Sequence, residues 1–129
     1  MNNTILIVDD ETSNLKILSF ILSPEYTVYT ARDGQTALGI AEESQPGLIL
    51  LDIIMPGMDG FEVLRALRAS DKTRQIPVVF ITGLTAGGLK AKEPAPEPAG
   101  YISKPFGAAD VRAKVRMHIQ DPAAKGAVI

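Results

Sequence analysis

Short apolar runs alternate with amphipathic stretches along most of the chain. The runs at residues 4–8, 47–53 and 76–83 are almost entirely apolar, which is typical of strands buried on both faces of a sheet. Residues 26–31 and 100–105 contain β-branched and aromatic side chains, and such side chains favour strands. The pattern therefore predicts strands at all of these positions.

Apolar side chains between the predicted strands recur every three or four residues. This spacing predicts helices at residues 13–22, 35–44, 61–70 and 108–120. Each helix would place its apolar side chains on one face and its polar side chains on the other. Polar residues at the helix starts are the expected N-caps, namely Thr12 or Ser13 for the first helix and Asp59 for the third.

The predicted strands and helices alternate along the chain. Because crossovers between parallel strands are right-handed, this order predicts a doubly wound α/β fold, with helices on both faces of the sheet. We expect a five-stranded parallel sheet in the order 2-1-3-4-5, which is a flavodoxin-like three-layer sandwich. One domain is expected over residues 1–120, followed by a linker or tail at residues 121–129.

Residues 84–100, "LTAGGLKAKEPAPEPAG", interrupt this pattern where the fourth crossover helix is due. Each proline inside a helix costs about 3 kcal/mol, and each glycine costs about 1 kcal/mol. We therefore expect the fourth helix to be shortened or irregular, with only residues 86–92 helical. The proline-rich residues 93–99 favour an extended path.

Composition narrows the range of functions. The chain has 129 residues, a formal net charge of -2 and a pI near 5.3, so it offers no electrostatic basis for nucleic-acid binding. Its apolar runs are too short to span a bilayer, and its first residues lack the basic leader of an export signal. A cytoplasmic location is expected. The absence of cysteine excludes disulfides and thiolate metal sites.

Polar side chains stand where several predicted strands end. Asp9 and Asp10 follow the first strand, Asp52 closes the apolar part of the third, Thr82 ends the fourth, and Lys104 follows the fifth. Ligands of open α/β sheets bind outside the carboxyl ends of the strands. We therefore expect these side chains to form one site.

Three converging carboxylates repel one another unless a cation lies between them. Oxygen ligands favour a hard divalent ion, so Mg2+ is the expected metal, with Mn2+ as a substitute. Asp52 could then attack a phosphoryl donor, because the metal and Lys104 would offset the charge that develops on the transferring group.

These residues lie in four motifs that resemble the receiver domain of two-component response regulators. The motifs are "ILIVDDE" (5–11), "LILLDIIMPGMDGFEVL" (48–64), "VVFITG" (78–83) and "YISKPF" (101–106). They occur in the order and at the separations usual for the family. The resemblance covers about residues 3–120 and implies a regulatory phosphoacceptor that assists its own phosphorylation and dephosphorylation, and is not otherwise an enzyme.

The resemblance implies a role for each candidate residue. Asp52 would accept a phosphoryl group from a histidine kinase or phosphotransfer protein, and Asp9, Asp10, Asp52 and the Ile54 carbonyl would bind the metal. Thr82 would bond a phosphoryl oxygen.

The resemblance also implies how the signal leaves the site. Lys104 would pair with the acyl phosphate and precede a cis bond to Pro105, and Tyr101 would act as an aromatic switch together with Thr82. The implied targets are an effector domain or a downstream protein, and a phosphorylation-dependent homodimer is one possible product.

Two alternatives remain open. One is a Mg2+-dependent phosphatase or phosphotransferase with an aspartyl nucleophile. Haloacid-dehalogenase-like enzymes carry a second Asp two residues after the nucleophile, where this chain has Ile54. The other is a degenerate receiver that acts by binding alone, although the chain keeps every residue of the motif. His118, the single histidine, is expected on the surface without a role.

Overall fold

The computed structural model describes residues 3–83 and 97–119. The elements follow in the order β1 (Thr4–Val8), α1 (Thr12–Leu22), β2 (Thr27–Ala31), α2 (Gly34–Ser44), β3 (Leu48–Asp52), α3 (Gly60–Ala69), β4 (Val78–Thr82), β5 (Gly100–Ser103) and α4 (Ala108–His118). The five predicted strands and the helices predicted at residues 13–22, 35–44, 61–70 and 108–120 are confirmed, with ends that differ by at most two residues.

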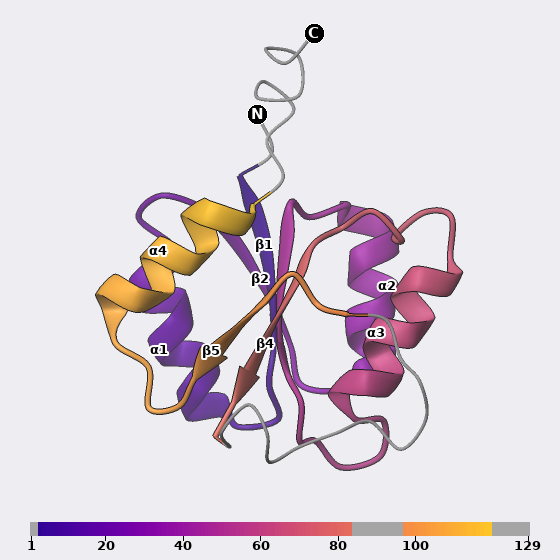
Figure 1. Ribbon diagram of the computed structural model, residues 1–129, viewed down its shortest axis with the longest axis horizontal. Helices are drawn as coiled ribbons and strands as arrows, with labels where there is room; N and C mark the ends of the chain where they lie inside the picture. The colour runs from indigo at the N-terminus through magenta and orange to yellow at the C-terminus, as the bar shows by residue number, and fades with distance from the viewer. Residues whose placement is uncertain (1–2, 84–96, 120–129) are drawn as a thin grey trace, which may run out of the picture.

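The strands form one parallel sheet in the order β2-β1-β3-β4-β5, as predicted. Helices α1 and α4 cover one face of the sheet, and α2 and α3 cover the other (Figure 1). The molecule is therefore the expected doubly wound, three-layer α/β sandwich. All strands point the same way, so their carboxyl ends meet along one edge.

Successive side chains of the central strands face opposite layers. Leu6, Val8 and Phe80 pack with α2 and α3, whereas Ile5 and Ile7 pack with α1 and α4. Every residue of β3 and β4 is buried, which explains why the two strands read as continuous apolar runs. Two apolar cores thus clamp the sheet and hold its carboxyl edge in place.

The start of α1 corrects one prediction. The N-cap is Glu11 and makes no side-chain capping bond, so neither Thr12 nor Ser13 has that role. The carboxylate of Asp9 explains the earlier start, because its Oδ1 accepts the Glu11 backbone N–H at 2.9 Å. The turn after β1 is thus organised by the buried acid.

The start of α3 follows the prediction. Asp59 is the N-cap and forms a capping box with Glu62, whose backbone N–H donates to Asp59 Oδ1 at 2.9 Å. Gly60 is required here, since a Cβ atom would lie 2.7 Å from the Asp52 carbonyl oxygen and from Ile53 Cα. The helix therefore begins in direct contact with the backbone of Asp52.

Three expected features lie wholly or partly outside the described residues. The shortened fourth crossover helix (86–92) and most of the proline-rich stretch fall in residues 84–96, and the tail falls in residues 120–129. Within the described ranges, no helix is long and apolar enough to cross a membrane.

The contact at Gly60 predicts a stability difference between two glycines. We expect Gly60→Ala to lower the free energy of unfolding by about 2 kcal/mol or more, because the backbone at residues 52–53 must move. Gly39 is a matched control in α2, because a Cβ atom added there would meet nothing within 4 Å. Gly39→Ala should raise stability by roughly 0.5–1 kcal/mol. Urea unfolding measures both changes, and equal stability of Gly60→Ala and the wild type would contradict the contact.

Candidate functional site

The three predicted acids meet at the carboxyl edge of the sheet. Asp9 and Asp10 follow β1, Asp52 ends β3, and one carboxylate oxygen of each lies within 4.8 Å of the others. Oxygens on opposite sides of a six-coordinate Mg2+ are roughly 4 Å apart. Adjacent oxygens are roughly 3 Å apart, so the carboxylates must draw together to bind such an ion directly, and the donor set fits a hard cation.

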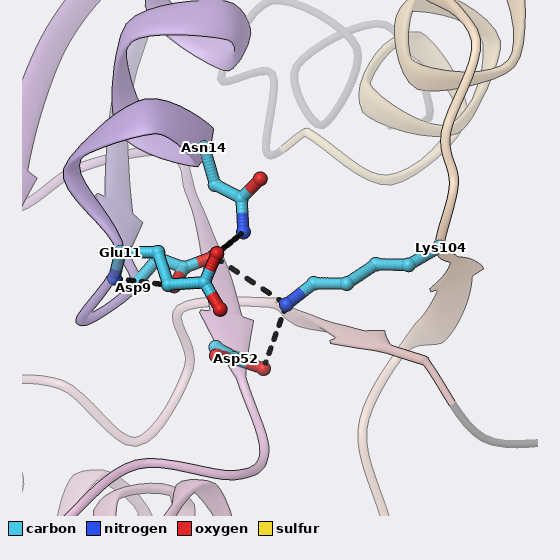
Figure 2. A network of polar contacts seen from close by, with 5 residues as sticks. All are labelled: Asp9, Glu11, Asn14, Asp52 and Lys104. Carbon is cyan, nitrogen blue, oxygen red and sulfur yellow. Dashed lines mark hydrogen bonds and ion pairs between the residues drawn. The ribbon is translucent and has the colours of Figure 1, made fainter.

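Asp9 is fully buried, and its carboxylate is held from several sides. Oδ1 accepts the Glu11 backbone N–H at 2.9 Å, and Oδ2 accepts a hydrogen bond from Asn14 Nδ2 at 3.1 Å (Figure 2). Sequence reasoning missed Asn14. Its polar side chain in the first turns of a helix that follows two acids was the available signal.

Lys104 reaches across the site from the end of β5. Its Nζ lies 3.5 Å from Asp52 Oδ1 and 3.7 Å from Asp9 Oδ2 (Figure 2). The Lys104 backbone N–H donates to the Thr82 carbonyl at 2.7 Å, and the Lys104–Pro105 peptide bond is cis, as expected. One ammonium group thus faces two carboxylates.

The environment of Asp52 disfavours its charged form. Burial and the nearby charge of Asp9 raise the pKa of Asp52 from 3.8 to about 6, although Lys104 opposes this shift. Only 5% of Asp52 is exposed. The charge of Lys104 therefore does not compensate fully for burial and repulsion, and the site would gain from additional positive charge.

The other predicted site residues, Thr82, Ile54 and Tyr101, differ in position and in exposure. Thr82 is buried at the end of β4, in register with Ser103. Ile54 is 60% exposed, and Tyr101 is 42% exposed on the edge strand β5. The structure thus gathers Asp9, Asp10, Asp52 and Lys104 in one cluster, whereas Tyr101 lies apart from it.

His118 is the last residue of α4 and is half-buried, so the expected surface position is only partly right. A Cβ atom on Gly100 would lie 2.8 Å from His118 Nε2. Because Gly100 begins β5, His118 lies at the end of the strand opposite to the acids.

A cavity of about 480 Å³ opens beside the acidic cluster. Its walls come from the start of α1 and from the segment after β5, and the lining residues are Glu11, Asn14, Ile17, Gly83, Lys104, Pro105 and Phe106. Polar groups lie on the side of the cluster, and Ile17 and Phe106 add apolar surface. The cavity therefore opens onto the side chain of Lys104.

Curated proteins similar to this chain include two bacterial proteins. Response regulator PleD of Caulobacter vibrioides is 43% identical over 117 residues, which cover 90% of this chain and 26% of PleD. A probable cyclic di-GMP phosphodiesterase of Vibrio cholerae is 35% identical over 129 residues, which cover 95% of this chain and 28% of that protein. The chain thus spans about a quarter of the length of these relatives.

A solved structure with the same fold is the chemotaxis response regulator CheY4 of Vibrio cholerae. It matches with a TM-score of 0.79 and 26% identity, over 92% of this chain and all of CheY4. The family model of the response regulator receiver domain matches residues 5–116. The match covers most of the chain, and the acids cluster at the carboxyl edge of the sheet. The chain therefore belongs to the response regulator receiver domain family.

Proposed function

We propose that this receiver domain takes a phosphoryl group onto Asp52, with Mg2+, from a histidine kinase or a phosphotransfer protein. The position of Asp52 between two further carboxylates and the ammonium of Lys104 carries this proposal. Asp52 is the acid at the end of the central strand β3, so the sheet fixes its position.

The transfer needs one nucleophile and compensation of negative charge. An Asp52 oxygen attacks phosphorus, a P–O bond forms, the P–N bond of the donor breaks, and the imidazole leaves with the electron pair. Lys104 lies close enough to Asp52 to pair with the oxygens of the transferred group. Asp9 is held by hydrogen bonds and therefore needs little rearrangement during the step.

Asp9, Asp10, Asp52 and the Ile54 carbonyl would hold the Mg2+, and Mn2+ could replace it. When bound, the ion would offset the negative charge of the carboxylates and would orient a phosphoryl oxygen. The raised pKa of Asp52 supports this assignment, because burial and the nearby charge of Asp9 disfavour the ionised form, and a bound cation would offset both effects.

Phosphorylation would act as a regulatory switch, and the domain would catalyse no other reaction. The acyl phosphate adds close to two negative charges and three strong acceptors. Thr82 would bond an oxygen of the phosphoryl group. Tyr101, on the edge strand β5, would then change its position. The expected readers are an effector domain, a downstream cytoplasmic protein or a second copy of the domain.

Replacing the proposed phosphoacceptor gives the first test. We expect Asp52→Asn to reduce labelling by a small acyl-phosphate donor with Mg2+ to background, because the amide is not a nucleophile. Asp71→Asn is the matched control, since the Asp71 side chain is 91% exposed and should label like the wild type. Mass spectrometry of the intact protein measures the label. Wild-type labelling of Asp52→Asn would contradict the assignment.

The pKa of Asp52 predicts how stability depends on pH without metal. A folded-state pKa of about 6, against an ordinary value of 3.8, means that ionised Asp52 destabilises the fold. In EDTA at pH 7 we expect Asp52→Asn to be more stable than the wild type by roughly 1–3 kcal/mol, at 1.36 kcal/mol per pKa unit.

The advantage of Asp52→Asn should shrink as pH falls. Folded Asp52 takes up its proton near pH 6, before the unfolded chain does so near 3.8, so the cost of the charge is lost across this window. Urea unfolding at pH 7, 5 and 4 in EDTA measures the trend, with Asp71→Asn as the exposed control. A variant less stable than the wild type at pH 7 would show that Lys104 outweighs burial and repulsion.

A further inference from the structure

Three aromatic side chains form a row from α3 to the edge of the sheet. The rings of Phe61 and Phe80 meet edge to face, with centroids 5.4 Å apart and an interplanar angle of 81°. The rings of Phe80 and Tyr101 are tilted by 56°, with centroids 5.9 Å apart. Both distances lie within the range of favourable aromatic pairs. We call Phe61, Phe80 and Tyr101 the aromatic row.

Phe80 is the fixed centre of the aromatic row. It is fully buried in β4 and stands in register with Tyr101 on β5. Thr82 lies two residues further along the same strand, so its side chain points to the same face of the sheet. The ring of Tyr101 thus packs against Phe80, which is not a member of the acidic cluster and is distinct from the proposed switch residue Thr82.

The other end of the aromatic row is tied to the backbone of Asp52. Phe61 is the second residue of α3, and the preceding Gly60 donates its N–H to the Ile53 carbonyl at 2.8 Å. The close approach of Gly60 to the Asp52 carbonyl leaves no space between helix and strand. A displacement of the Asp52–Ile53 peptide must therefore move the first turn of α3.

We infer that Phe61 and Phe80 are positioning residues for Tyr101, which link the backbone at Asp52 to the sheet edge through the aromatic row. Phe80 is fully buried in a close-packed interior, so a displacement of its ring is passed to the two rings that contact it. This link runs through Phe61 and Phe80 and does not involve the Thr82 side chain, and it rests on the proposed function of Asp52.

A fluorine probe at Tyr101 tests the inference. Fluorotyrosine is placed at position 101 only, and its 19F NMR signal is followed while Mg2+ and fluoroberyllate, an analogue of the phosphoryl group, are added. Phe61→Leu and Phe80→Leu remove a ring but keep an apolar side chain. We expect the signal of the ligand-free protein to shift in both variants, and the ligand-induced change to fall at least twofold.

Two further variants separate positioning from general stability. Phe61→Tyr keeps the ring and its packing and should restore the wild-type response. Phe20→Leu changes an α1 side chain that is 82% exposed and should leave the response unchanged. Amide signals near Asp52 report whether fluoroberyllate binds in each variant.

The outcomes separate the inference from the proposed function. Wild-type protein with no fluoroberyllate-dependent amide shifts at Asp52 would overturn the proposed function. Binding at Asp52 with no change at Tyr101, or with a full change in Phe61→Leu, would overturn the aromatic row as a link. An unchanged ligand-free signal in both Leu variants would also overturn it, independently of any ligand.

Discussion

Two buried carboxylates share one ammonium group in this protein, and the rest of the site is arranged around that imbalance. Asp9 and Asp52 both lie within 4 Å of Lys104 Nζ, but the raised pKa of Asp52 shows that one cation does not offset burial and mutual repulsion. Such a group of charges is unfavourable in an isolated fold. It is reasonable in the proposed site, which would receive a further cation and a phosphoryl group.

The fold supplies the rigidity that keeps these charges together. The acids stand at the ends of β1 and β3, which are neighbours at the centre of the sheet, and Lys104 comes from the far edge. Two apolar cores fix the strands from both faces. The hydrogen bonds to Asp9 from Glu11 and Asn14 then orient its carboxylate. Stability is thus concentrated in the sheet, and the chemistry is placed at its edge.

Periodicity predicted the strands, the helices and the layers, because buried parallel strands and amphipathic helices leave clear patterns. The strand order usual for a doubly wound fold then predicted the convergence of the acids. The N-cap at Asp59 was also predicted, since it directly precedes the helix in the sequence. The start of α1 was predicted wrongly. The carboxylate of Asp9, which precedes the helix, accepts the Glu11 backbone N–H, so the helix starts without a side-chain cap from Thr12 or Ser13. Asn14 was missed because its hydrogen bond to Asp9, five residues earlier, follows no local capping pattern. The aromatic row joins three separate elements, and its contacts depend on register and side-chain direction that no local pattern specifies.

The central claim is that Asp52 is the residue that accepts the phosphoryl group. Borohydride reduces an aspartyl phosphate to homoserine, so phosphorylated protein can be trapped, digested and sequenced by mass spectrometry. The account predicts homoserine at position 52 and unmodified Asp9 and Asp10. Homoserine at position 9 or 10, or a phosphoryl group found on His118 instead, would contradict it.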